Sequence, residues 1–136
     1  FRLYGIDAPE SNQTCAGAQG RSYRCGVEAG NWLRSWIQDN VLECHVMQQD
    51  ENGNMVGTCS LGQYDLGAAI VNAGWAVAYL KYTDIYYPYE ENARAARAGL
   101  WQGRFYMPWD WRVMQAQKPK IKIIKPKVRK KSLLDG

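Results

Sequence analysis

Four cysteines constrain the fold of this chain more than any other feature, because each disulfide fixes two distant points of the backbone. They are Cys15, Cys25, Cys44 and Cys59 in a chain of 136 residues. No C-x-x-C spacing occurs and the only histidine is His45, so a zinc site is not indicated. We interpret the cysteines as two disulfides, Cys15–Cys25 and Cys44–Cys59, which indicates an oxidising compartment.

The sequence around each cysteine favours this pairing. Cys15 and Cys25 enclose a polar loop, where buried free thiols are not expected. A cross-link there would stabilise the fold by about 3 kcal/mol in the chain-entropy model. Cys44 and Cys59 lie in two predicted strands of one hairpin. The alternative interpretation is four buried free thiols in a cytosolic protein.

The turn of the predicted hairpin can form in two ways. A type I turn over residues 50–53 has Asp first and Gly last, which are preferred there, and it sets Cys44 opposite Cys59. A two-residue turn at residues 52–53 would instead set Leu61 opposite Cys44. Both registers keep the two cysteines on one face, so both are compatible with the disulfide.

The first ten residues predict a strand that ends in a rigid corner. Residues 1–6 are mostly good strand formers, and Pro9 stops the pairing because it has no N–H to donate. Pro9 also holds the residue before it in an extended conformation. Asp7 and Glu10 therefore lie on either side of a stiff corner. This arrangement suits a hard cation, which Asp7 and the Ala8 carbonyl could both face.

A positive charge accompanies these carboxylates. Arg2 has a planar fork that fits a phosphate. A straight strand would direct Arg2 and Asp7 to opposite faces, because they are five positions apart. They converge only if the strand bends, and Gly5 is where a bend is expected. The alternative interpretation is an ordinary Asp-Pro turn with a solvated arginine.

The net positive charge is concentrated at the C-terminal end. Eight of the 17 basic residues lie within residues 118–131, whereas the first 117 residues contain more acidic than basic side chains. The body is therefore not an anion-binding surface by bulk charge, and anion binding there must come from a few placed arginines. The tail could bind an anionic polymer or a membrane surface, or it could be solvated without a specific partner.

The length fits one domain, which we place at residues 1–112, followed by a basic extended arm over residues 113–136. Because Phe1 already reads as part of a strand, we expect a further strand upstream of it. No apolar run is long enough to span a bilayer. The oligomeric state is not indicated.

Hydrophobic periodicity predicts three helices. The first spans about residues 27–40. The second begins after Asp65 as its N-cap and ends at Gly74. The third has Pro88 in its first turn and ends at Gly99. The segments predicted to be extended are residues 41–49, 54–60 and 75–82.

A set of short motifs occurs along residues 1–112 in a characteristic order. The motifs are Arg-Leu-Tyr-Gly-Ile-Asp-Ala-Pro-Glu (2–10), a following helix, Asp-x-x-Gly-x-x-Val-Gly-Thr (50–58), Asp-Leu (65–66), Gly-Trp-Ala (74–76), Ala-Tyr (78–79) and Gly-Leu-Trp (99–101). In this order they resemble the staphylococcal (thermo)nuclease-like family. The Trp-Asp-Trp-Arg end (109–112) and the cysteine pairs resemble exported members of this group, which implies a periplasmic or secreted protein.

The resemblance implies an α+β fold, mainly β, in which a five-stranded OB-type barrel carries three helices. It also implies Ca²⁺-dependent hydrolysis of phosphodiester bonds in DNA and RNA. Carried over by position, Asp7 would be a Ca²⁺ ligand with the Ala8 carbonyl beside it, and Glu10 would orient or deprotonate the attacking water. Arg2 would bind the scissile phosphate and stabilise charge in the transition state. This role requires Arg2 to share one pocket with Asp7 and Glu10.

The resemblance further implies that Tyr79 and Tyr82 line a nucleotide pocket. One departure is that the family places a second arginine where this chain has Asn54. Losing one such donor typically costs a factor of about 10²–10³ in rate, roughly 3–4 kcal/mol. Arginines elsewhere that could substitute are Arg94, Arg97 and Arg104.

A second departure is that the other calcium carboxylate of the family lies in a strand before the opening motif, and we expect it upstream of Phe1. With Asp7 as the only protein carboxylate ligand, metal affinity would be low. The alternative function is therefore a catalytically degenerate OB-type module that binds nucleic acid or another polyanion without cutting it.

Overall fold

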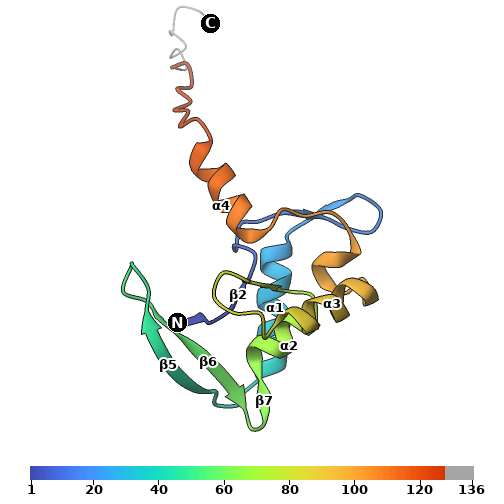
Figure 1. Cartoon of the computed structure of the whole chain (residues 1–136). Helices are drawn as coiled ribbons and strands as arrows, with labels where there is room; N and C mark the ends of the chain where they lie inside the picture. Colours follow the sequence, from blue (N-terminus) through green and yellow to red (C-terminus); the bar gives the residue numbers. More distant parts are fainter. Residues whose placement is uncertain (128–136) are drawn as a thin grey trace, which may run out of the picture.

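The computed structural model describes residues 1–127 of the chain (Figure 1). The elements in chain order are β1 (Arg2–Leu3), β2 (Ile6–Asp7), β3 (Cys15–Ala16), β4 (Ser22–Tyr23), α1 (Cys25–Ile37), β5 (Glu43–Gln49), β6 (Met55–Leu61), β7 (Tyr64–Asp65), α2 (Leu66–Asn72), β8 (Val77–Ala78), α3 (Tyr87–Ala96), the 3₁₀ turn η1 (Gly99–Gln102) and α4 (Pro108–Gln117). The hairpin of β5 and β6 projects to one side of α1, α2 and α3, and α4 leads away from the body into the C-terminal arm.

The hairpin has the register expected from a type I turn. Cys44 lies opposite Cys59, and the two form a disulfide. The Gly53 N–H donates to the Asp50 carbonyl at 3.0 Å. The carboxylate of Asp50 closes the turn further, because it accepts from the backbone N–H of Asn54 at 2.9 Å. The second predicted disulfide, Cys15–Cys25, is also present, so the prediction of two disulfides is confirmed.

The strands form three separate sheets. β6 pairs with β5 and β7 in antiparallel and with β1 in parallel, which gives a four-stranded sheet. β2 pairs with β8, and β3 pairs with β4. Within residues 1–127 no closed barrel forms, so the predicted five-stranded barrel is not seen as such. The physical reason is that β1, β2 and β8 are only two residues long, and the turn at residues 4–5 separates β1 from β2 and sends them to different partners.

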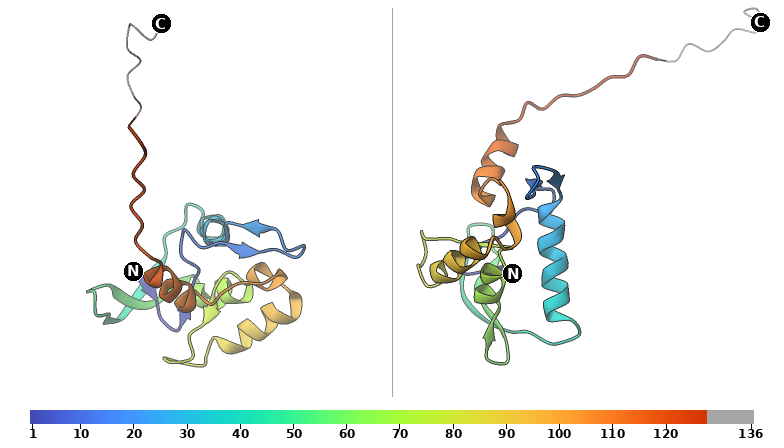
Figure 2. Two further views of the ribbon diagram at one scale, coloured as in Figure 1. Left: turned by 90° about the horizontal axis from the view of Figure 1, so that it is seen from above. Right: turned by 90° about the vertical axis from the view of Figure 1, so that its right-hand side faces the viewer.

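The described residues contain four α-helices rather than the predicted three. The additional helix, α4, begins at Pro108, which suits a first helical position because its fixed φ is helical and its missing N–H needs no partner there. It runs across the predicted boundary between residues 112 and 113. Beyond it, residues 118–127 form no helix or strand and run away from the body as an extended segment (Figure 2). The predictions for residues 128–136 lie outside the described residues.

The other predicted helices are present with shifted ends. α1 begins and ends two to three residues earlier than expected. α2 starts as predicted, since the Asp65 carboxylate accepts from the Ala68 N–H at 2.9 Å. α3 ends at Ala96 and not at Gly99, because its C-cap residue Arg97 takes the left-handed conformation with φ of 51°. Of the segment 75–82, only Val77–Ala78 is a strand.

A buried carboxylate fixes α3 against β8. Glu90 is 3% exposed and accepts from the Ala78 N–H at 3.0 Å. Its other oxygen pairs with Arg94 at 2.7 Å. The core beneath is apolar and is formed by Ile70, Val71, Ala76, Ala78 and Tyr86. Because β8 also pairs with β2, this contact links α3 to the strand that carries Asp7.

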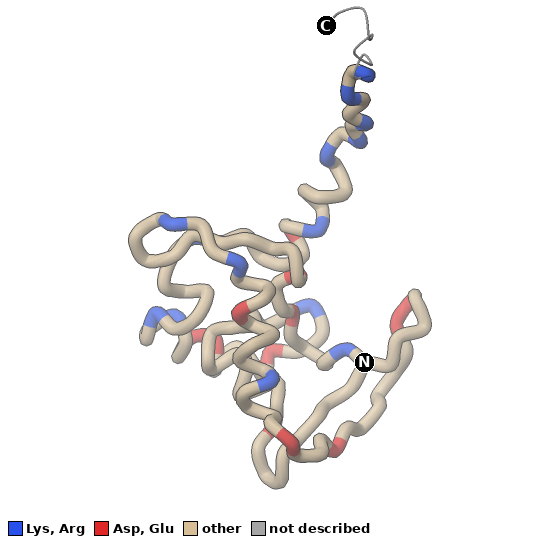
Figure 3. Tube along the Cα trace, turned by 180° about the vertical axis from the view of Figure 1, so that it is seen from behind, with Lys and Arg blue, Asp and Glu red and all other residues tan. Residues whose placement is uncertain are grey.

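The charges are distributed as the sequence indicates. Acidic and basic residues are mixed over the body, whereas only basic residues follow one another along the arm (Figure 3). In the part of the chain that the structure describes, no helix is both long and apolar enough to cross a membrane.

Candidate active site

The opening motif bends at Gly5, as expected. Gly5 has φ of +77°, and a Cβ there would lie 2.6 Å from the Thr83 side chain, so a larger residue would be strained. The bend sends β1 to pair with β6 and β2 to pair with β8. Arg2 and Asp7 therefore line one cavity of about 240 Å³, which we call the polar pocket.

The polar pocket collects residues from both ends of the chain. Its lining residues are Arg2, Leu3, Ile6, Asp7, Asp50, Val56, Tyr79, Tyr82 and Arg112. An adjoining, mainly apolar cavity of about 410 Å³ shares Arg2, Asp7 and Arg112 with it and adds Glu10. The three charged residues of the opening motif thus border the same space.

Arg112 of α4 joins the two carboxylates of the motif. Its Nη1 donates to Asp7 Oδ1 at 3.1 Å and to Glu10 Oε1 at 2.7 Å, and its Nη2 donates to Asp7 Oδ2. The side chains of Asp7, Glu10 and Arg112 are 11%, 41% and 36% exposed. Hydrogen bonds to Asp7, and then to Glu10, raise the pKa of Arg112 above its ordinary value despite partial burial, so the guanidinium stays charged.

The charged partner of Arg2 is a different carboxylate. Arg2 Nη1 lies 3.4 Å from Asp50 Oδ2, and the Arg2 side chain is half exposed. Asp50 also accepts from the side-chain amide of Asn54 at 3.1 Å. Hydrogen bonds hold the pKa of Asp50 below its ordinary value, and the one that the Asn54 N–H donates has the largest effect. Because the Arg2 side chain is half exposed and its distance to Asp50 is long, this pair is weak, and Arg2 is available to an anion.

Asn54 is thus engaged in the turn, and no arginine on this turn faces the polar pocket. Within residues 1–127, none of the three proposed substitutes lines that pocket. Arg94 pairs with Glu90 and lies over the ring of Trp101 at 4.4 Å, and Arg97 ends α3. The second guanidinium at the pocket is Arg112, which the sequence analysis did not select. Its only signal was its place in the Trp-Asp-Trp-Arg motif.

Aromatic rings form one wall of the polar pocket. Tyr82 stacks on Tyr4 with ring centroids 5.8 Å apart, and Tyr79 meets Tyr82 edge-on at 5.0 Å. Trp109 of α4 lies 5.5 Å from the Tyr79 ring. Tyr79 and Tyr82 are therefore where a nucleobase could stack beside the pocket.

The site does not fit a divalent cation in this arrangement. In the described part of the chain, no group of three or more His, Cys, Asp or Glu side chains could hold an ion. Calcium usually takes about six to eight oxygen ligands. Here the two carboxylates, Asp7 and Glu10, are both hydrogen-bonded to Arg112.

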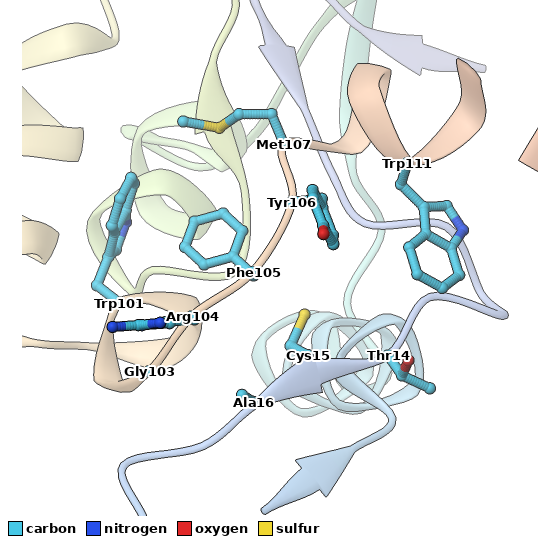
Figure 4. Close-up of a pocket in the computed structure, with 10 residues that line it drawn as sticks. All are labelled: Thr14, Cys15, Ala16, Trp101, Gly103, Arg104, Phe105, Tyr106, Met107 and Trp111. Carbon is cyan, nitrogen blue, oxygen red and sulfur yellow. The ribbon is translucent and has the colours of Figure 1, made fainter. Parts of the chain in front are cut away.

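A second, larger cavity of about 630 Å³ lies between η1, β3 and α4, and Trp111 is one of its lining residues (Figure 4). Its lining residues are Thr14, Cys15, Ala16, Trp101, Gly103, Arg104, Phe105, Tyr106, Met107 and Trp111. Its one charged side chain is Arg104, and no carboxylate or histidine lines it. It therefore offers no pair of groups for acid–base chemistry, and the polar pocket remains the candidate site.

Comparison with known proteins identifies the family of this chain. The family described as "Staphylococcal nuclease homologue" matches residues 1–103. "Probable endonuclease LCL3" of Yarrowia lipolytica is 30% identical over 126 residues, which cover 82% of this chain and 54% of that protein. "Probable staphylococcal-like nuclease CAN1" of Oryza sativa subsp. japonica is 31% identical over 115 residues, with coverages of 82% and 32%.

An "Uncharacterized 38.1 kDa protein" of Capnoides sempervirens is 32% identical over 115 residues, which cover 82% of this chain and 31% of that protein. The chain thus spans about half or less of the length of these relatives. The family match includes the opening motif, the hairpin and α1 to α3, and the two disulfides agree with the disulfide-containing subgroup. This chain belongs to the family of staphylococcal nuclease homologues.

Proposed function

We propose that this protein is a nuclease that hydrolyses phosphodiester bonds in DNA or RNA. One observation carries the proposal: the arginine and the two carboxylates of the opening motif border a single space, as hydrolysis of a phosphodiester requires. Membership of the family supports nuclease activity in general, and the names of two relatives include an endonuclease and a nuclease.

Each side chain has a role that suits its surroundings. Glu10 is accessible to water and would orient or deprotonate the attacking molecule. Arg2 is weakly paired and would bind the scissile phosphate, where its fork meets charge on the phosphoryl oxygens. Tyr79 and Tyr82 would stack on the bases that flank this phosphate, because every base offers a flat face.

We propose in addition that the nuclease activity depends on Ca²⁺. It comes from the family resemblance, and the carboxylate of Asp7 with the Ala8 carbonyl are oxygen ligands of the kind that Ca²⁺ prefers. The two disulfides support a location in an oxidising compartment, and we propose export to the periplasm or the medium.

The test is cleavage of single-stranded DNA and of RNA by the purified chain, with Ca²⁺ or with EDTA. Glu10→Gln should lower the rate by a factor of about 10² or more, because it removes the base but keeps the side-chain shape. Glu43→Gln is the matched control, since the Glu43 side chain is exposed on β5, where its carboxylate lies 3.3 Å from His45 Nε2, and it does not line the polar pocket. Cleavage that persists in both EDTA and the Glu10 variant would defeat the proposal.

A second function is favoured by Asn54. Its amide is hydrogen-bonded to Asp50, so the turn supplies no positive charge to a phosphate. A degenerate module that binds a polyanion without cutting it would fit this feature. It requires binding to single-stranded DNA that weakens steeply with salt, together with no cleavage under any cation tested.

A further inference from the structure

Two further cavities adjoin the polar pocket along the start of α4. The first, of about 330 Å³, shares Tyr79 with the polar pocket and is also lined by Lys81 and Trp109. The second is the cavity of about 630 Å³ between η1, β3 and α4, which shares Met107 with the first. We call these three cavities, joined at Tyr79 and at Met107, the α4 groove.

Aromatic rings line the α4 groove from one cavity to the next. The ring centroids of Tyr79 and Trp109 are 5.5 Å apart where the polar pocket meets the next cavity. In the largest cavity Phe105 meets Trp101 edge-on at 4.8 Å, and Figure 4 shows these two rings on one side and Trp111 on the other. All five residues are partly exposed, so a ligand can reach them.

The charges along the α4 groove leave two cations for an anion. Each carboxylate that lines the groove pairs with an arginine, and the pairs are Asp7–Arg112, Asp50–Arg2 and Glu90–Arg94. Lys81 and Arg104 are exposed, and neither forms an ion pair with any other residue of the described range 1–127. Each of the two further cavities therefore has one unpaired cation, Lys81 in the first and Arg104 in the second.

We propose that the α4 groove binds a single strand of nucleic acid beyond the phosphate at the polar pocket. The bases stack on Trp109 and Phe105, and the phosphates contact Lys81 and Arg104. The inference rests on the proposed function for the class of ligand, but binding of a strand can be measured without cleavage. Arg104, Phe105 and Trp109 lie outside residues 1–103, which the family matches, so this part of the groove does not come from the family match.

The chemistry of the groove favours an unpaired strand. Aromatic side chains combined with cations are typical of proteins that bind single strands, because every unpaired base offers a flat face. The bases of a duplex already stack on each other, and separating them costs free energy. A duplex is held mainly by many phosphate contacts, whereas the two further cavities supply only Lys81 and Arg104 as unpaired cations.

The first experiment measures binding of a labelled oligothymidine strand of about 16 nucleotides to the full chain, by fluorescence anisotropy in EDTA and about 50 mM salt. Arg104→Gln should bind the strand about fivefold to tenfold more weakly than the parent. The slope of log affinity against log salt should become shallower by about 0.7, as expected for one lost phosphate contact. Phe105→Leu, which keeps an apolar side chain without a flat ring, should bind at least about fivefold more weakly with an unchanged salt slope.

Arg34→Gln is the matched control, because Arg34 is exposed on α1 and lines none of the three cavities. It should bind the strand like the parent. An equal loss of affinity in Arg34→Gln and Arg104→Gln would show binding by overall charge and would overturn the inference. Equal affinity in the parent, Arg104→Gln and Phe105→Leu, with folding confirmed by circular dichroism, would overturn it as well.

The second experiment needs no variant, so it holds even if Phe105→Leu fails to fold. The same oligothymidine is compared, at low temperature, with its duplex with oligodeoxyadenosine. The single strand should bind the parent at least about fivefold more tightly, although the duplex carries about twice the charge per unit length. A duplex that binds as tightly as the single strand would refute stacking of bases in the groove.

Cleavage of the same strand with Ca²⁺ separates the two proposals. Weaker binding by Arg104→Gln and Phe105→Leu, with no cleavage by the parent under any cation tested, would sustain this inference and defeat the nuclease. Cleavage by the parent, with binding unchanged in both variants, would sustain the nuclease and overturn this inference.

Discussion

Replacement of Glu90 tests whether α3 stabilises the strand beside the candidate site. Glu90 is 3% exposed and accepts from the Ala78 N–H on β8 at 3.0 Å. Its second oxygen pairs with Arg94, whose side chain is 44% exposed. Glu90→Ala removes the only side-chain acceptor of a buried N–H and leaves a small void behind it.

The expected cost can be estimated from these contacts. A buried donor that loses its partner costs about 1–3 kcal/mol, and a buried hydrogen bond to a charged group contributes about 1.5–3 kcal/mol. The ion pair itself adds little, because Arg94 is partly in water. We therefore expect Glu90→Ala to lower the free energy of unfolding by about 3 kcal/mol. Glu90→Gln, which keeps an acceptor, should cost about 1 kcal/mol.

Equilibrium unfolding in urea, with both disulfides intact, measures these differences. For a denaturant slope of about 1–3 kcal/mol per molar, 3 kcal/mol corresponds to a midpoint lower by about 1–3 M. Glu91→Ala is the control, because Glu91 is the exposed neighbour in the same helix. The reasoning fails if Glu90→Ala and Glu91→Ala are equally stable.

Three further outcomes are expected. Asn54→Arg should raise the rate of DNA cleavage by a factor of about 10² or more, since it restores a guanidinium beside the phosphate; an unchanged rate at saturating substrate would contradict this. Burial, and then a hydrogen bond to Asp65, raise the pKa of Tyr86 above its ordinary value of 10.0, so stability is full below pH 10 and falls as the pH rises further. Tyr86→Phe should show a smaller alkaline loss in thermal unfolding, and an equal loss would refute the assignment. Replacement of Cys44 and Cys59 by Ala should cost about 3 kcal/mol in urea unfolding, because the cross-link closes a 15-residue separation; a cost near zero would refute it.

Local turn and cap chemistry made much of the fold predictable. Asp65 caps α2 through its own carboxylate, and residues 50–53 form the turn that sets Cys44 opposite Cys59. Each of these features depends on residues within a few positions of one another. A bend at Gly5 followed from the same kind of reasoning, because two side chains five positions apart had to reach one pocket.

The features that sequence missed depend on distant contacts. The strand pairing of β1, β2 and β8 ends after two residues because of the turns and segments around them. Local strand propensity does not predict where such pairing ends. Helix α4 has a proline start but no apolar stripe clear enough to set it apart from the lysine-rich arm. The observed helix ends differ from the predicted ones by two or three residues because they too depend on distant contacts. At the end of α3, for example, the non-glycine residue Arg97 takes the left-handed conformation.

The candidate site shows the same division between local and distant information. The motif of the first ten residues contains both carboxylates, so their closeness to each other could be predicted from spacing. Their partner could not, because Arg112 lies 105 positions from Asp7 and several other arginines were equally plausible by sequence. Its choice depends on where the start of α4 packs, which Pro108 and Trp109 determine. The positive charge beside the acid pair is therefore set by the packing of α4, which the residues of the opening motif do not specify.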